Sequence, residues 1–229
     1  MLNLKKSKIY KVLKLISFSF LYYILKTLSI NNRLFYLSKW VRDNGDDRLL
    51  VNYPINSKGT ILDVGGYTGV FSDKLLAIND VNLIIFEPVQ KYYKILKKKY
   101  TKNRKVKIYN LGLSDQNYSD SISVSNDSTS LFKNTGKTEK ANFIDVGLFV
   151  KKVKKIDLMS INIEGSEYQV LDRLIKTNQI KKIKYVQIQF HDFVPNAKIM
   201  RRALIKKILK THKIRYSYPF VWESFELIN

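Results

Sequence analysis

The sequence lacks cysteine altogether, which excludes disulfide bonds, thiolate zinc sites and a cysteine nucleophile. This absence fits a reducing cytoplasm, and we expect the protein to act there. Proline is scarce, at four of 229 residues, and with 45% hydrophobic residues the chain is not of the disordered class. Long apolar runs are also missing, because the uncharged stretch 15–25 is shorter than the ~20 residues that a membrane-spanning helix needs. The length suits one α/β domain with an appendage.

Acidic residues are few, 19 against 41 lysines and arginines, so the formal net charge is +22. Such a surface can attract nucleic acid or an anionic membrane. The excess is mostly lysine and accompanies abundant Ile, Asn and Tyr, a composition that A+T-rich coding produces without selection for a partner. No block of arginines interleaved with aromatic residues occurs. We therefore place nucleic-acid binding below both incidental basic surface and membrane attraction.

Residues 1–57 are predicted to form an N-terminal helical extension. In the stretch 9–24 the large apolar residues share one face at helical spacing, with Lys11 and Lys14 opposite. A helix packed on the main domain, a signal peptide and a basic amphipathic membrane helix all fit this pattern. The signal peptide is disfavoured because no small-residue cleavage site follows. We expect packing on the domain, with peripheral contact of residues 1–30 with the inner face of the membrane as a further hypothesis.

The most informative stretch runs from Thr60 to Phe71. A short apolar strand carries Asp63 near its end and leads into the glycine-rich turn 65–69, after which a helix is predicted. Small residues let a ligand approach the backbone, and the helix start supplies unpaired N–H groups. About twenty residues further on, a second apolar run ends at Glu87, which places a carboxylate where it can bind a ribose.

Two cofactors use this geometry, a nicotinamide dinucleotide and S-adenosylmethionine. The dinucleotide fingerprint G-x-G-x-x-G needs a middle glycine so that the pyrophosphate can lie against the turn. Tyr67 occupies that place here, and its side chain would meet the pyrophosphate. The methionine end of S-adenosylmethionine is smaller, and Asp63 can bind its ammonium group directly or through water. The sequence therefore favours S-adenosylmethionine over the dinucleotide, and both over a purely structural turn.

From residue 58 onward, strands alternate with helices, which is typical of a doubly wound, mostly parallel sheet. We predict one α/β domain over 58–229 whose last two strands are antiparallel. The seven expected strands of its sheet are 60–64, 83–87, 106–113, 158–163, 185–190, 214–218 and 221–228. A β excursion is predicted at 121–125 and 143–150. The segment 133–140 is expected to be mobile and able to close over a site.

Five short motifs occur in the order found in one known family. They are DVGGYTG at 63–69, FEP at 86–88, LGLSD at 111–115, INIEGSE at 161–167 and QFH at 189–191. By these motifs, and by the closing PFVWESFE at 219–226, the chain resembles the FkbM-type S-adenosylmethionine-dependent methyltransferases over about residues 58–228. The resemblance implies a Rossmann-like class I methyltransferase fold with S-adenosylmethionine as methyl donor. It also implies O-methylation of a hydroxyl, often on a sugar.

The resemblance assigns donor-binding roles to residues of three segments. The methionine end would be held by Asp63 and the turn residues Gly65, Gly66, Tyr67 and Gly69, the ribose hydroxyls by Glu87, and the adenine amino group by Asp115, which follows Ser114. Acids at two successive strand ends are hard to explain by packing alone. An aspartate after a strand, such as Asp115, is often only a turn residue.

Asn162, Glu164 and His191 fall where the family lines its acceptor pocket. Asn162 replaces the family's Asp and Gln189 its Glu, so two carboxylates become amides that hydrogen-bond but are weak bases. We therefore expect no metal ion, and we predict His191 as the base, since its unperturbed pKa is about 6.5. Glu164 can orient the histidine or the acceptor. The competing interpretations are a strand-capping histidine and, for Glu164 and Glu167, acids at a helix N-terminus.

We therefore predict an O-methyltransferase that acts on a saccharide or sugar conjugate in cell-surface polysaccharide biosynthesis. An RNA methyltransferase is one alternative, because the surface is basic. A non-catalytic member that binds the donor without turnover is the other, because of the two amides. Outside the motifs, we expect His212 at the surface and Trp222 and Phe225 in the core or a lid.

Overall fold

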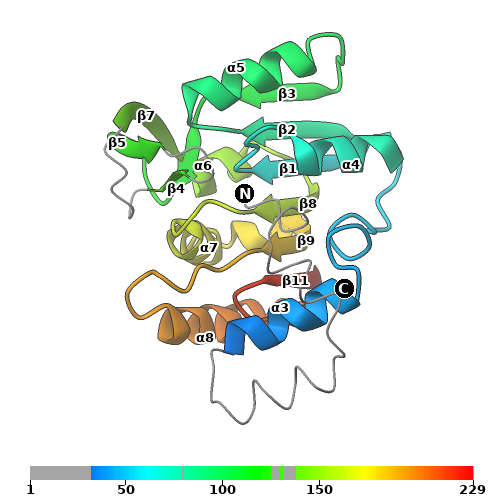
Figure 1. Ribbon diagram of the computed structural model, residues 1–229, viewed down its shortest axis with the longest axis vertical. Coiled ribbons are helices and arrows are strands. Elements are labelled where there is room, and N and C mark those ends of the chain that lie inside the picture. Colours follow the sequence, from blue (N-terminus) through cyan, green and yellow to red (C-terminus); the bar gives the residue numbers. More distant parts are fainter. Residues whose placement is uncertain (1–31, 79, 125–128, 131–137, 229) are drawn as a thin grey trace.

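The computed structural model describes residues 32–78, 80–124, 129–130 and 138–228 (Figure 1). Its centre is a seven-stranded sheet in the order β10-β11-β9-β8-β1-β2-β3. The strands are β1 (Thr60–Val64), β2 (Asn82–Phe86), β3 (Val106–Tyr109), β8 (Ile156–Ile161), β9 (Ile183–Ile188), β10 (His212–Tyr218) and β11 (Trp222–Leu227). The first five are parallel, and β11 is antiparallel to both β9 and β10. The predicted doubly wound, mostly parallel sheet is confirmed.

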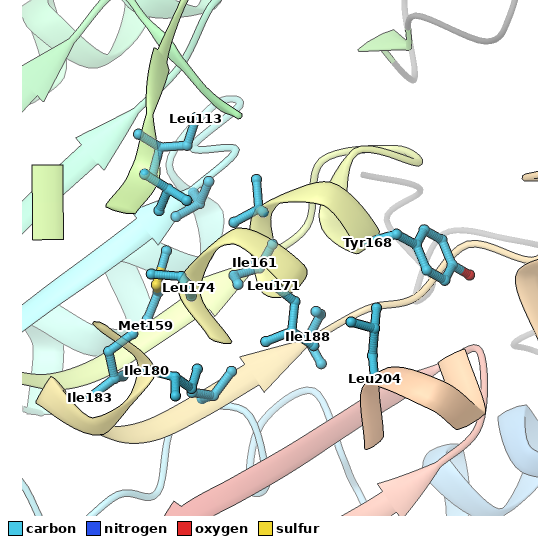
Figure 2. Close-up of a cluster of buried hydrophobic side chains, with 14 of the residues drawn as sticks. Leu113, Met159, Ile161, Tyr168, Leu171, Leu174, Ile180, Ile183, Ile188 and Leu204 are labelled. Carbon is cyan, nitrogen blue, oxygen red and sulfur yellow. The ribbon is translucent and has the colours of Figure 1, made fainter. Parts of the chain in front are cut away.

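Helices cover both faces of this sheet, so its inner strands are buried on two sides and read as continuous apolar runs. The helices are α3 (Asn32–Arg42), α4 (Val70–Ile78), α5 (Gln90–Lys99), α6 (Val146–Lys151), α7 (Glu167–Lys176), the 3-10 helix η2 (Gln179–Lys182) and α8 (Ala197–Ile208). Side chains of α3, α4 and α5 share one core cluster. Those of α6, α7, η2 and α8 share another, in which Leu171 and Leu174 of α7 pack on the strands (Figure 2).

The strand order explains where a ligand binds. From β1 the chain continues outward through β2 and β3, and it later returns to the other side of β1 through β8 and β9. The direction of winding therefore reverses between β1 and β8. In open α/β sheets, ligands bind outside the carboxyl ends of the strands at such a reversal.

A second sheet of four strands, in the order β4-β7-β5-β6, follows β3. Its strands are β4 (Gly112–Ser114), β5 (Tyr118–Val124), β6 (Thr129–Ser130) and β7 (Thr138–Asp145). The predicted β excursion exists, but the single strand predicted at 106–113 is wrong. The chain leaves the main sheet at Asn110, whose side-chain amide donates to the carbonyl oxygens of Glu87 and Pro88 at 2.9 Å each.

The strand predicted at 143–150 is also wrong beyond Asp145. The Asp145 carboxylate accepts hydrogen bonds from the backbone N–H groups of Gly147 and Leu148, at 2.7 and 3.1 Å, and so starts α6 in place of a longer strand. Of the segment predicted to be mobile, residues 138–140 belong to β7. The remainder, up to 137, lies outside the described residues.

The described part of the N-terminal extension packs on the core of the main sheet. Trp40 of α3 is fully buried, and its indole N–H donates to Asp46 at 2.9 Å. The Tyr53 hydroxyl lies in the same face of the sheet and donates to the buried Gln187 at 2.8 Å. The helix predicted within residues 9–25 lies outside the described residues, and the domain boundary at 58 stays a prediction.

Of the other expectations for the C-terminal part, one is confirmed and one is wrong. Trp222 and Phe225 are buried, and their packing role is confirmed. The surface position expected for His212 is wrong, because His212 begins β10 and points inward, with its Nε2 3.0 Å from the Ile183 carbonyl oxygen. Burial lowers the pKa of this imidazole. Within the described ranges, no helix is both long and apolar enough to cross a membrane.

Candidate functional site

The glycine-rich turn after β1 is shaped by the protein's own packing. Gly65 has a φ of 93°, and a Cβ added there would lie 2.2 Å from the carbonyl oxygen of Asn162. A Cβ on Gly66 would lie 2.2 Å from a methyl group of Ile85. Gly69, with a φ of 81°, is confined in the same way by the Tyr100 hydroxyl. Glycine is therefore required here because the ends of β1, β2 and β8 converge, in addition to any approach of a ligand.

Two carboxylates meet at this point. Asp63 is buried and accepts a hydrogen bond from the Ser72 hydroxyl at 2.6 Å. Glu87 is buried and accepts from the backbone N–H groups of Tyr67 and Val89, at 2.7 and 2.8 Å. Burial raises the pKa of Asp63 to about 6 and that of Glu87 to about 7, and the charge of Asp63 also raises the pKa of Glu87.

Tyr67 completes the turn with a strained backbone, at a φ of 49°. Its N–H fixes the Glu87 carboxylate, and its ring lies 4.4 Å from that of Tyr92, centroid to centroid. Among the described Lys, Arg and His side chains, none forms an ion pair with Asp63 or Glu87. The turn is therefore a buried acidic site that favours a cationic or hydroxyl-bearing ligand.

The second group of predicted residues follows β8 and β9. Glu164 has a φ of 51°, which strains the backbone where β8 turns into α7. Glu167 is fully buried in the first turn of α7, and its Oε1 accepts from the backbone N–H of His191 at 2.7 Å. The same oxygen lies 3.0 Å from His191 Nδ1, and Glu164 Oε1 lies 3.7 Å from His191 Nε2.

This arrangement fixes the tautomer of His191. The Glu167 oxygen can accept a hydrogen bond from Nδ1–H, so Nε2 is the nitrogen with the lone pair in the neutral imidazole. The ring is 7% exposed, and the Tyr168 hydroxyl donates to the His191 carbonyl oxygen at 2.7 Å, which holds the loop in place. A histidine held in this way can take a proton at Nε2.

Glu167 is a candidate site residue that was not selected from the sequence. It lies in the first turn of α7 as predicted, but its carboxylate points to His191 and not to solvent. The available signal was the spacing of two glutamates three residues apart around Gly165, whose N–H donates to Glu167 at 2.8 Å. Glu164 and Glu167 thus approach opposite nitrogens of His191 from one short turn.

The two amide residues, Asn162 and Gln189, follow β8 and β9. The backbone N–H of Asn162 donates to the Val64 carbonyl oxygen and that of Gln189 to the Ile161 carbonyl oxygen, both at 3.0 Å. The carbonyl oxygen of Asn162 also lies against Gly65 of the glycine-rich turn, and Asn162 precedes the loop that leads to Glu164. Its Oδ1 is buried and has no hydrogen-bond partner within the described part of the chain. A buried acceptor of this kind suits an N–H or O–H donor on a ligand.

Ser114 and Asp115 lie apart from the two carboxylates. Ser114 is fully buried, whereas Asp115 is exposed and lines a cavity of about 340 Å³ beside α7 and α8. Among the described residues no contact joins Asp115 to Asp63 or Glu87. Its role toward adenine stays a prediction.

The seven-stranded sheet, with acids at the ends of β1 and β2, has the mostly parallel order expected for the class I methyltransferase fold. The model of the FkbM methyltransferase domain matches residues 63–217, and the chain belongs to this family. It is therefore an S-adenosylmethionine-dependent methyltransferase.

Comparison with solved structures gives only distant likenesses. The chain is similar to a putative rRNA methylase from Clostridium thermocellum, with 11% identity and a TM-score of 0.49 over 76% of this chain and 89% of that one. It is also similar to fibrillarin from Methanococcus jannaschii, with 13% identity and a TM-score of 0.47 over 77% of this chain and 69% of that one. A third similar structure is the N-methyltransferase NodS from Bradyrhizobium japonicum, solved with S-adenosylhomocysteine. Its identity is 9% and its TM-score 0.43, over 76% of this chain and 80% of that one. No curated protein matches the sequence.

Proposed function

We propose that the protein transfers a methyl group to a hydroxyl of a saccharide or sugar conjugate in the biosynthesis of a cell-surface polysaccharide. The observation that carries this proposal is the His191–Glu167 pair, a base held after β9 at the same edge of the sheet as the glycine-rich turn after β1. A sugar hydroxyl is a poor nucleophile and gains from losing its proton as the new bond forms. The choice of a sugar is supported by the family, whose members often methylate sugar hydroxyls.

The residues at the turn fit S-adenosylmethionine, which supplies a methyl group on a positively charged sulfur. Asp63 binds the ammonium group of its methionine end, and Glu87 binds the ribose hydroxyls. Asn162 Oδ1, buried and otherwise unpartnered among the described residues, accepts a hydrogen bond from the donor or the acceptor. Gly65, Gly66, Tyr67 and Gly69 shape the turn, while Ser114 and Asp115 approach the adenine.

On the acceptor side, His191 Nε2 takes the proton of the hydroxyl. Glu167 positions the ring and stabilises the imidazolium that results, and Glu164, on the Nε2 side, holds the acceptor. Positioning of the acceptor oxygen by these side chains is itself a large source of rate enhancement in reactions that join two bound molecules. No residue of this scheme needs a metal ion.

The donor site is tested by calorimetric titration with S-adenosylhomocysteine, with NAD as the control ligand. We expect binding of S-adenosylhomocysteine alone. Glu87→Ala is expected to weaken it by about 1–3 kcal/mol, the scale for a hydrogen bond to a charged group, and Asp63→Ala to abolish it. Binding of NAD, or affinities unchanged by both substitutions, would contradict the donor assignment. A screen of saccharide acceptors with labelled donor then tests the reaction.

Donor binding is expected to strengthen as the pH rises from about 6 to about 8, because the ligand needs both carboxylates ionised. The raised pKa values act on stability in the opposite sense. The free protein holds these protons at a pH where the unfolded chain has lost them, so its stability falls as the pH rises from about 4 through about 7. Titration in buffers of different ionisation enthalpy should detect proton release on binding. Affinity independent of pH would contradict this.

A non-catalytic role is the second candidate, and the amides Asn162 and Gln189 favour it. It predicts binding of S-adenosylhomocysteine but no methylated product with any acceptor.

We further propose that the protein works in the cytoplasm, in peripheral contact with the membrane through residues 1–30. That segment joins α3 at Asn32.

A further inference from the structure

The outward side of α8 and the turn after it are basic. Six exposed residues at helical spacing lie on the side that faces away from the core, and we call them the α8 outer face: Lys198, Ile199, Arg202 and Lys206 of α8, and Leu209 and Lys210 of the turn that follows. Four carry positive charge, and two are exposed aliphatic residues, Ile199 at 68% and Leu209 at 40%. The opposite side of the helix is buried through Ala197, Leu204 and Ile208.

No acid within the described ranges forms an ion pair with this face. Between 193 and 222 the sequence has eight lysines and arginines and no acid. The acids of neighbouring elements are paired with inward-facing or flanking cations, Glu223 with Arg201 and Asp172 with Lys207. None of the four cations of the α8 outer face has an ion-pair partner within the described residues. The face therefore presents unneutralised charge to any anionic surface.

The α8 outer face begins beside the acceptor site. The loop that carries His191 leads directly into α8, and it exposes the ring of Phe193, which is 38% accessible and contacts the His191 ring. Asp192 in this loop pairs with Arg33 of α3 at 3.1 Å. The chain before Asn32 thus joins the described fold next to the acceptor loop. In Figure 1, α8 and α3 lie at one end of the molecule and α5 lies at the other.

We propose that the α8 outer face docks on an anionic lipid surface and presents the His191 loop to it. Clusters of four to eight lysines and arginines bind anionic lipids, and exposed aliphatic side chains among them insert at the interface. An RNA surface would use the cations equally but would gain nothing from Ile199 and Leu209. With respect to the acceptor, the inference rests on the proposed function and names its class, a saccharide carried on a lipid.

The test measures partition of the full-length protein into vesicles that contain phosphatidylglycerol and into vesicles of phosphatidylcholine alone. We expect the triple variant Lys198→Gln/Arg202→Gln/Lys206→Gln to bind the anionic vesicles on the order of a hundredfold more weakly. Each membrane-binding segment multiplies the partition coefficient of the protein by its own factor. Loss of the factor of the α8 outer face therefore lowers the coefficient by the same ratio even when residues 1–31 also bind. Ile199→Ser is expected to weaken binding several-fold, because one apolar contact is lost.

A matched control removes the same charge from the opposite end of the molecule, in Lys94→Gln/Lys97→Gln/Lys98→Gln on α5. The control is expected to bind nearly as the unmodified protein does. Equal losses in both triple variants would mean that only net charge matters, and would overturn the proposal, as would no loss in the α8 variant. A loss of binding to structured RNA with vesicle binding intact would assign the face to nucleic acid instead. Vesicle binding needs neither donor nor acceptor, so these outcomes are independent of the methyl transfer itself.

Discussion

Replacing His191 by alanine is expected to lower the rate of methyl transfer by about 10²–10⁴-fold, the range for loss of a general base. The imidazole is the group whose Nε2 keeps a lone pair at the acceptor site, and alanine leaves no base there. Donor affinity should stay near that of the unmodified protein, because His191 contacts neither Asp63 nor Glu87. Single-turnover rates with labelled donor, and titration with S-adenosylhomocysteine, measure the two effects separately.

Glu167→Gln separates a positioning role from a merely structural one. Glutamine keeps an oxygen that accepts from the His191 backbone N–H, but it removes the charge that stabilises the imidazolium. The rate of methyl transfer should therefore fall while the affinity for S-adenosylhomocysteine stays unchanged. An unchanged rate would limit Glu167 to packing. Unchanged turnover in His191→Ala would remove the histidine from the mechanism.

The elements around β1 could be predicted because their signals are local. An apolar run, a turn of glycines and a helical pattern lie next to one another, and the helix predicted after the turn is confirmed as α4. The boundaries after β3 could not be predicted in the same way. Asn110 leaves the sheet because of carbonyl groups at 87 and 88, and Asp145 starts a helix with Arg173 bound to its carboxylate. Neither set of partners is close in the sequence.

In the candidate site, too, the residues marked by local signals could be predicted and the long-range contacts could not. Asp63, Glu87, Glu164 and His191 could be selected from the sequence because each follows a predicted strand, and the carboxyl ends of parallel strands meet at one edge. Which carboxylate would hold the histidine could not be selected. That depends on the turn at Gly165, whose φ of 114° brings Glu167, 24 residues away in the sequence, under the imidazole.

Arg201→Leu is expected to lower the free energy of unfolding by about 3–5 kcal/mol, the range for breaking a buried ion pair on one side. Glu223 of β11 is 1% exposed, and Arg201 of α8 donates to both of its oxygens, one of them at 2.6 Å. With leucine at 201, the Glu223 carboxylate would keep only the Ser217 hydroxyl, also at 2.6 Å. The pair fixes α8 to the sheet, and therefore also fixes the loop that carries His191.

Denaturant unfolding of Arg201→Leu is compared with that of two further variants. Arg202→Leu changes the exposed neighbour on α8, and we expect little change in stability. The double variant Arg201→Leu/Glu223→Leu removes both charges, and it should recover most of the loss, because an apolar pair of similar volume needs no compensation for a buried charge. A double variant as unstable as Arg201→Leu alone would show that the arginine acts through its packing on Phe220, whose ring centroid lies 5.5 Å from the guanidinium carbon. In that case the buried charge of Glu223 is not what Arg201 compensates.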